Sequence, residues 1–158
     1  IGRNDDHAAL AAHVAKLVYT RQVFSEAMRL YPPAPIIART SLADFALGGF
    51  RIPAGTELFV PIFAVHHHEN IWSDPHVFDP ERFAPDAGKD RHRYAYMPFG
   101  AGPRVCIGNA FAVTEAVIIL AVLLQKLRLV ATDPAPPVPV MKVTLRPKFS
   151  MMMRLSAR

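Results

Sequence analysis

The sequence predicts a mainly α protein that carries small antiparallel β-sheets, an α+β fold class. Two segments, residues 6–31 and 108–126, have the apolar periodicity and the length of helices. Short β-type runs interrupted by glycine and proline follow each of them. The chain of 158 residues is 51% hydrophobic, so it can bury one sizeable core and is expected to be one domain or a piece of one.

The first expected helix, residues 6–31, has apolar side chains at helical spacing. The positions that would form its apolar face are Val23, Phe24, Ala27 and Leu30. Two prolines at 32 and 33 should end the helix. Residues 36–61 then read as hairpin strands of a small antiparallel sheet, with turns at Gly48-Gly49 and Pro53-Ala54-Gly55, and residues 63–68 as a short helix.

The segment of residues 72–102 is rich in proline, aspartate, glycine and aromatic residues and has no sustained period. It should be long, ordered and irregular. Such a length of chain without regular structure is uncommon inside a compact domain and usually serves a function. The segment leads directly to Cys106, the only cysteine.

The second expected helix, residues 108–126, is apolar on nearly every side, which is typical of a helix buried inside a larger protein. Its most apolar stretch, residues 116–124, is about half the length that crosses a bilayer, so no membrane segment is expected. A proline-rich connection at 133–139 leads to two β-like runs, 140–145 and 149–155, around a turn at 146–148.

Composition restricts the partners and the compartment. Eighteen basic and thirteen acidic side chains give a formal charge of +5, which favours an acidic partner. The basic residues are scattered and not gathered in a stripe with aromatics, so no nucleic acid is expected. One cysteine excludes an intrachain disulfide and fits a reducing, cytoplasmic compartment.

A glycine-rich loop brings Cys106 to the first turn of the second helix. Glycines at 100, 102 and 108 let the backbone turn sharply and approach a flat ligand, and Arg104 puts a permanent charge two residues from the sulfur. The positive end of a helix favours the thiolate, the form that binds metal. A solitary cysteine is commonly only a small buried apolar residue, but this loop favours a ligand.

Glu26 and Arg29, three residues apart, would alone indicate an exposed helix pair worth about 0.2–0.5 kcal/mol. Here Leu-Tyr-Pro-Pro at 30–33 follows them, then Pro-Glu-Arg-Phe at 80–83, and finally the cysteine loop. With these motifs in this order, the sequence resembles the cytochromes P450 from about residue 17 to its end. The cysteine-loop pattern of that family, Phe-x-x-Gly-x-Arg-x-Cys-x-Gly, is met by Phe99, Gly102, Arg104, Cys106 and Gly108.

The resemblance implies that residues 1–158 are the C-terminal haem-binding portion of the cytochrome P450 fold. It implies Cys106 as the thiolate ligand of haem b, iron protoporphyrin IX. Arg104 and Arg39 would pair with the propionates, Phe99 would pack near the sulfur, and Ala112 would face the haem. The residues implied in cofactor binding are Arg39, Phe99, Gly100, Gly102, Arg104, Cys106, Ile107, Gly108 and Ala112. A buried charge triad of Glu26, Arg29 and Arg82 is also implied.

The implied activity is that of a haem-thiolate monooxygenase, which hydroxylates an apolar small molecule with O2. Residues 34–37 and 143–144 match positions that line the family's substrate pocket. Electrons would come from NAD(P)H only indirectly, through a ferredoxin- or flavodoxin-type donor. We expect Lys89, Arg91 and Arg93 to help attract the acidic surface of such a donor.

The family's oxygen-activating helix, with its acid-alcohol pair, has no match in residues 1–25, so the N-terminal part is expected to be absent. The exposed apolar helix should then cause self-association or pairing with that part. Two alternatives stay open: a truncated remnant that binds haem without monooxygenase activity, and a haem-free interaction module. A metal site is also conceivable at His66, His67, His68 and His76, but adjacent helix residues point in different directions, which disfavours it.

Overall fold

The computed structural model describes residues 12–158, so the first part of the predicted helix, residues 6–11, lies outside the described residues. Residues 12–15 are helical, but Leu17 has non-helical dihedrals (φ −81°, ψ 53°), and α2 spans Val18–Leu30. No proline or glycine marks this break in the sequence. The helix ends at Tyr31, whose N–H donates to the Ala27 carbonyl, and the two prolines that follow prevent its continuation.

The buried face of α2 differs from the apolar face that the periodicity predicted. Its buried residues are Gln22, Glu26, Met28, Arg29 and Leu30. Of the predicted apolar face, Leu30 is fully buried and Val23, Phe24 and Ala27 are half-buried, so the most protected side of the helix is shifted from it. Polar side chains occupy the protected side because they find partners there, which an apolar pattern cannot reveal.

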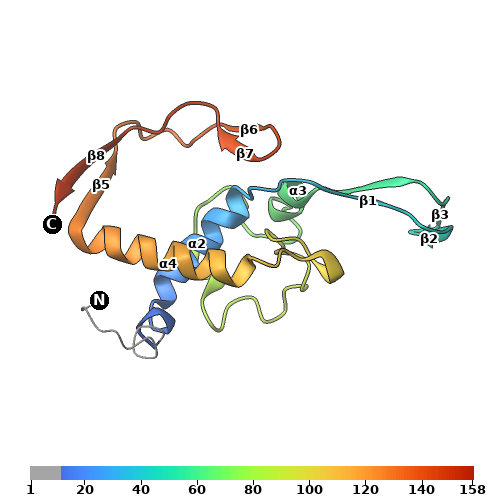
Figure 1. Ribbon diagram of the computed structural model, residues 1–158, viewed down its shortest axis with the longest axis horizontal. Helices are drawn as coiled ribbons and strands as arrows, with labels where there is room; N and C mark the ends of the chain where they lie inside the picture. Colours follow the sequence, from blue (N-terminus) through green and yellow to red (C-terminus); the bar gives the residue numbers. More distant parts are fainter. Residues whose placement is uncertain (1–11) are drawn as a thin grey trace.

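The predicted hairpin region forms two separate antiparallel pairs rather than one sheet. β1 (Ile37–Thr40) pairs with β4 (Glu57–Val60), and β2 (Phe45–Leu47) pairs with β3 (Phe50–Ile52). The glycines at 48 and 49 both have positive φ (57° and 84°), as a two-residue hairpin turn requires. These strands extend away from the helices (Figure 1). The short helix α3 (Ile62–His66) follows and lies close to the predicted range.

The segment between α3 and α4 is irregular, as predicted. Within the described residues it contains two short 3₁₀ turns, Pro80–Phe83 and Gly102–Arg104. Trp72 fixes this segment to the core, because it is only 1% exposed. The guanidinium carbons of Arg29 and Arg91 lie 5.0 and 4.1 Å from the Trp72 ring centroid. Cation–π contacts and burial therefore help to hold this segment in place of strand ladders.

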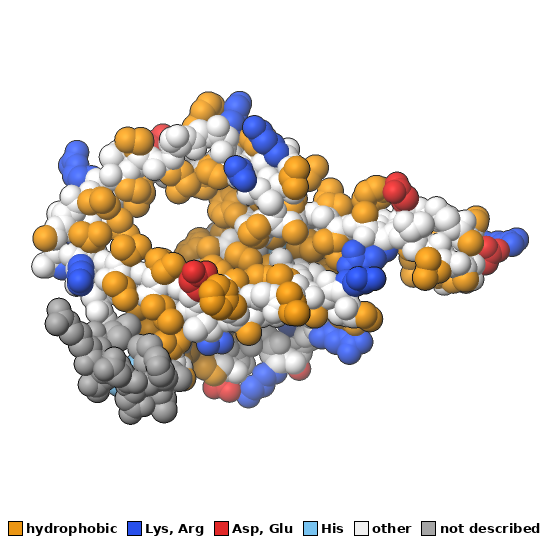
Figure 2. Space-filling view, viewed as in Figure 1, with side chains coloured by type: hydrophobic (Ala, Val, Ile, Leu, Met, Phe, Trp, Pro, Cys, Tyr) orange, Lys and Arg blue, Asp and Glu red, His pale blue; other side chains and the backbone are white. Residues whose placement is uncertain are grey.

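The second helix, α4 (Asn109–Lys126), forms where it was predicted and contacts α2. Only Val117 of its side chains is fully buried, whereas Phe111, Ile119 and Leu123 are exposed. Hydrophobic side chains gather over this helix in the space-filling view (Figure 2). The helix α4 is long and apolar enough to cross a membrane. Core helices of soluble proteins can have the same length and composition.

The C-terminal strands pair differently from the prediction. β5 (Leu127–Ala131), which was not predicted, pairs with β8 (Met153–Ala157). The run predicted as one strand over 140–145 is instead divided between β6 (Pro139–Met141) and β7 (Leu145–Pro147), which pair with each other. The predicted turn at 146–148 was therefore wrong in position. Apolar runs identify strand-forming residues, but pairing depends on partners that are distant in sequence.

Candidate functional site

Cys106 lies in the loop that precedes α4, three residues before the first helical residue and not in the first turn as predicted. Backbone hydrogen bonds close this loop. The Cys106 N–H donates to the Phe99 carbonyl (2.9 Å), and the Val105 N–H donates to the Gly102 carbonyl (3.0 Å). The Asn109 N–H, at the start of α4, donates to the Cys106 carbonyl (3.3 Å). The loop thus holds the backbone of Cys106 from both sides.

The surface around the sulfur is exposed and apolar. Cys106 is exposed, Val105 is 45% exposed, Ile107 is fully exposed and Phe111 is 71% exposed. A Cβ atom added to Gly108 would lie 3.8 Å from the Cys106 sulfur. An exposed apolar surface of this kind next to a thiol fits an apolar ligand laid over it.

Two loop glycines have backbone conformations that other residues rarely adopt. Gly100 has φ +75° and Gly102 has φ +73°. A Cβ atom at either position would meet nothing within 4 Å, so glycine is needed for the dihedral and open space lies beside the backbone. Phe99 at the start of the loop and Ala112 on α4 are both half-buried.

The two arginines predicted to bind anionic groups are exposed. Arg39 lies on β1 and donates from Nη1 to its neighbour's carbonyl, that of Ala38, at 2.7 Å. Arg104 ends the 3₁₀ turn beside Cys106. Within residues 12–158, the ion pairs within 4.0 Å do not involve either guanidinium. Both positive charges are therefore available to an external anion.

Glu26, Arg29 and Arg82 meet in the interior. Arg29 makes a bidentate pair with Glu26, with Nε–Oε2 and Nη2–Oε1 distances of 2.7 Å. Arg82 Nε lies 3.4 Å from Glu26 Oε1. The side chains of Glu26 and Arg29 are fully buried and that of Arg82 is 8% exposed. One carboxylate thus faces two guanidiniums, an arrangement in which removal of the carboxylate would strand buried charge.

The same charged groups organise the irregular segment. The Asp79 N–H donates to Glu26 Oε1 (3.0 Å). Arg29 Nη1 donates to the carbonyls of His66 and Pro75 (both 2.8 Å), and Nη2 donates to that of Val77 (3.2 Å). Backbone that would otherwise lack partners is satisfied by α2 side chains, so the segment is ordered without regular structure.

His66 is a buried residue whose role the sequence did not indicate. Its side chain is 0% exposed. Burial lowers the pKa of its imidazole from 6.5 to about 4, so the ring is neutral near pH 7. The neighbouring Tyr96 donates from its hydroxyl to the Ser25 carbonyl (3.1 Å), and burial raises its pKa to about 12. The described residues contain no group of three or more His, Cys, Asp or Glu side chains placed to hold a metal ion.

The basic residues predicted to face an electron donor are not equivalent. Arg91 is half-buried, stacks on Trp72 and donates to the Arg82 carbonyl (3.1 Å). Lys89 is exposed and forms an ion pair with Asp86 (2.9 Å), and Arg93 lies over the exposed Tyr94 ring. The structure therefore uses Arg91 internally, which leaves Lys89 and Arg93 as the surface charges.

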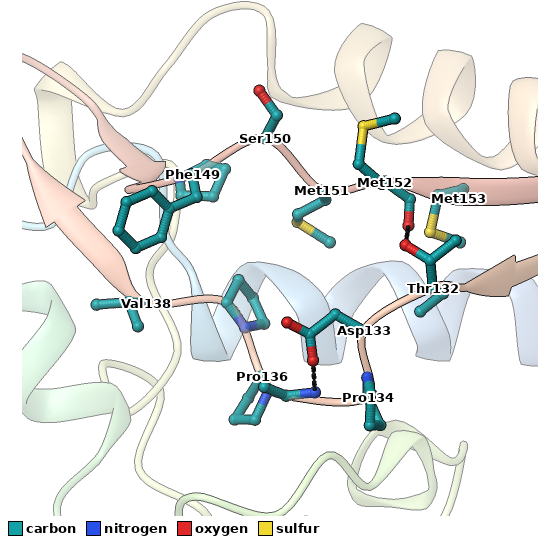
Figure 3. A pocket seen from close by; sticks show the side chains of 14 residues that line it. Thr132, Asp133, Pro134, Pro136, Val138, Phe149, Ser150, Met151, Met152 and Met153 are labelled. Atoms are coloured by element: carbon teal, nitrogen blue, oxygen red, sulfur yellow. Dashed lines mark hydrogen bonds between the residues drawn. The ribbon is translucent and has the colours of Figure 1, made fainter.

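Two hollows lie elsewhere on the chain. One, of about 290 Å³, is apolar; among the residues that line it are Pro35, Ile36, Phe63, Met141 and Leu145. It includes part of the 34–37 segment expected at the substrate pocket, whereas Val143 is 97% exposed and not among its lining residues. The other, of about 640 Å³, lies between the proline-rich connection and the run Met151–Met153, where Thr132 donates to the Met152 carbonyl (Figure 3).

Comparison with known sequences identifies one family. Residues 3–153 match the sequence model described as Cytochrome P450. Cytochrome P450 734A5 of Oryza sativa subsp. japonica is 43% identical over 140 residues, which are 87% of this chain and 26% of that protein. A cytokinin hydroxylase of Arabidopsis thaliana is 38% identical and matches 90% of this chain and 28% of its own length. Cyclooctatin synthase of Streptomyces melanosporofaciens is 38% identical, with 89% and 29% covered.

Solved structures lead to the same family. The heme domain of cytochrome P450DA superposes with a TM-score of 0.85 at 32% sequence identity, over 93% of this chain and 33% of that one. The chain thus spans between a quarter and a third of the length of these relatives. The α+β fold class predicted from the sequence, as the C-terminal part of such a fold, is confirmed.

Proposed function

Because the chain belongs to the cytochrome P450 family, we propose that residues 1–158 are the C-terminal haem-binding portion of a haem-thiolate monooxygenase in which Cys106 ligates the iron. The observation that carries the proposal is the position of the sulfur. It is exposed in an apolar surface, in a glycine-rich loop whose backbone is fixed against the start of α4. A thiol that served only packing would be buried.

The residues around Cys106 fit a flat, apolar group with anionic substituents. Ile107 and Phe111 expose apolar side chains, and Gly100 and Gly102 leave open space beside the backbone. Arg39 and Arg104 offer guanidiniums for carboxylates, which they can bind by paired hydrogen bonds. Haem b, iron protoporphyrin IX, has this chemistry; when bound, it supplies O2 activation and the transfer of one oxygen atom to substrate.

The substrate and the electron donor form part of the proposal. The apolar hollow bounded by Pro35, Ile36 and Leu145 supports an apolar small-molecule substrate. Electrons would reach the protein from NAD(P)H through a ferredoxin- or flavodoxin-type donor, with Lys89 and Arg93 as exposed charges for its acidic surface. The single cysteine supports a cytoplasmic location.

The experiment that tests the proposal is a carbon monoxide difference spectrum of the reduced, haem-supplemented protein. We expect the absorption signature of thiolate ligation in the wild-type protein and its loss in Cys106→Ala. The substitution should leave the fold intact because the Cys106 side chain is exposed. Ser150→Ala, which changes a side chain at the other hollow, is the matched control.

Three other outcomes would point to a different function or a different ligand. A protein that stays colourless with haem would be a haem-free interaction module, and the proposal would fail. A thiolate signature without turnover in the presence of a reductant would indicate a haem-binding remnant. Haem bound equally well by Cys106→Ala would place the ligand elsewhere.

A further inference from the structure

His66 connects three segments that are far apart in sequence. Its Nδ1 lies 3.1 Å from the carbonyl of Arg29 on α2, and Arg29 Nη1 donates back to the His66 carbonyl at 2.8 Å. On the other side of the ring, the backbone N–H of Met97 donates to Nε2 at 3.0 Å. The imidazole therefore bridges α2 and the chain that enters the cysteine loop.

The hydrogen bonds determine the tautomer of His66. Because a backbone N–H can only donate, Nε2 must be the unprotonated acceptor for Met97. The proton then lies on Nδ1, which donates to the Arg29 carbonyl. Both ring nitrogens are satisfied only in this neutral form, because a second proton on Nε2 would face the Met97 N–H.

Backbone hydrogen bonds link Met97 to Cys106. The Met97 carbonyl accepts the Gly100 N–H (2.9 Å), and the Phe99 carbonyl accepts the Cys106 N–H (2.9 Å). Two side chains thus tie the entrance of the loop to α2: His66 through the Met97 N–H and the Arg29 carbonyl, and Tyr96, whose hydroxyl donates to the Ser25 carbonyl. Loss of the His66 contact should loosen the Met97 backbone at the entrance of the loop, while the Tyr96 contact and the internal turn of the loop remain.

We propose that His66 is a positioning residue for Cys106, which couples the entrance of the cysteine loop to α2 through the Met97 N–H and the Arg29 carbonyl. The significance of a positioned sulfur rests on the proposed function. The coupling itself is a property of this chain and can be measured without haem.

The surroundings of His66 favour this role over that of a proton carrier. Arg29 on α2 with its partner Glu26, His67 directly after α3, and Tyr96, whose ring is stacked at 5.4 Å, are titratable or charged groups near it. The charged partners already neutralise one another in the bidentate pair of Glu26 and Arg29. A neutral, fully buried ring with both nitrogens bonded is suited to hold geometry.

Two substitutions separate the two hydrogen bonds of His66. In His66→Gln, the side-chain oxygen can reach the Nε2 position and accept the Met97 N–H. In His66→Asn, the shorter amide can reach only the Nδ1 position and donate to the Arg29 carbonyl. His66→Phe removes both bonds and keeps a ring. His68→Gln is the matched control, because the His68 side chain is exposed and, among residues 12–158, accepts a hydrogen bond from the Asn70 N–H at the surface.

Hydrogen exchange at the Met97 and Gly100 amides and the alkylation rate of the Cys106 thiol give readouts besides activity. We expect His66→Asn and His66→Phe to raise the exchange rates and the alkylation rate by about tenfold, as for a lost buried hydrogen bond. In His66→Gln and His68→Gln these rates should stay close to those of the wild type. Equal rates in the Gln and Asn variants would overturn the proposal. If His66→Phe does not fold, the comparison of Gln with Asn still decides.

The same variants, supplied with haem, test whether the contact of His66 with Met97 affects ligation of the iron by Cys106. The thiolate-ligated share in the carbon monoxide difference spectrum should fall in His66→Asn and be retained in His66→Gln. An unchanged share in His66→Asn would contradict a positioning role. If the wild-type protein takes up no haem, the proposed function fails, while the exchange and alkylation rates still test His66.

Discussion

At the scale of single residues, the interior of this chain contains a cluster of charged and hydrogen-bonded side chains beside its apolar core. Glu26, Arg29 and His66 are all 0% exposed, and between them they bond to α2, α3 and the irregular segment. Each buried polar atom that finds a partner avoids a desolvation penalty, so the cluster is stabilising only as long as it is complete.

Glu26→Gln is expected to destabilise the protein by about 3–5 kcal/mol, because it leaves the Arg29 and Arg82 guanidiniums buried without their counter-charge. Urea unfolding measures the loss. Lys89→Gln is the control, since the pair of Lys89 with Asp86 is exposed and should contribute less than about 1 kcal/mol. Similar losses in the two variants would contradict a buried charge cluster.

The pKa of His66 predicts a loss of stability in acid. The folded value of about 4 lies below the ordinary 6.5, so between these pH values the unfolded chain binds a proton that the folded chain does not. Stability from this group is present above about pH 6.5 and is lost as the pH falls toward 4. Urea midpoints of the wild type and His66→Gln across this range should differ in slope. Parallel curves would mean that His66 does not stay neutral.

At the scale of elements, the irregular segment replaces backbone ladders with stacked side chains. Trp72 lies beside the guanidiniums of Arg29 and Arg91, and Arg91 also lies over Phe83 at 5.6 Å. Gly88 makes room for this arrangement: it has φ +71°, and an added Cβ would lie 2.8 Å from the Arg91 guanidinium carbon. Position and conformation of Arg91 therefore depend on a residue with no side chain.

Gly88→Ala should displace Arg91 from Trp72 and change the fluorescence of Trp72, the only tryptophan of the chain. Gly55→Ala is the matched control, because Gly55 has φ +82° but nothing within 4 Å of an added Cβ. Both variants should lose about 1 kcal/mol or more through backbone strain. Only the first should alter the emission. An unchanged spectrum in Gly88→Ala would show that Arg91 keeps its contact.

At the scale of the whole molecule, α4 exposes more apolar surface than a separate domain would. Ile119, Leu123 and Leu124 are each 38–49% exposed, although the helix is long and apolar enough for a protein core. The family relatives are three to four times longer than the matched region. The exposed apolar face of α4 should therefore favour self-association of this chain, because association removes apolar side chains from water.

We predict that light scattering finds the 158-residue chain self-associated, and that Leu123→Lys shifts it toward the monomer. A charge on the exposed face of α4 opposes its burial against another copy. Val143→Lys is the control, because Val143 is 97% exposed on a turn away from α4 and should leave the assembly unchanged. A clean wild-type monomer would contradict the prediction.

The sequence by itself determined the features that short segments encode. The helix over 108–126, the hairpin turn at Gly48-Gly49 and the irregular segment before Cys106 follow from periodicity, glycine dihedrals and proline content. The order of its motifs was enough to predict the family, which the comparisons confirmed. The loop that carries Cys106 was predicted to bind a ligand. Cys106 itself lies before α4 and not in the first turn of that helix.

The tertiary structure alone decided which side chains are buried and what they bond to. The polar face of α2, the pairing of β5 with β8, the stacking of Arg91 and the two hydrogen bonds of His66 were not predicted. His66 and Met97 are 31 residues apart, and His66 and Arg29 are 37 apart. Local patterns record which structure a segment prefers, whereas partners for buried polar groups arise only when distant segments pack together.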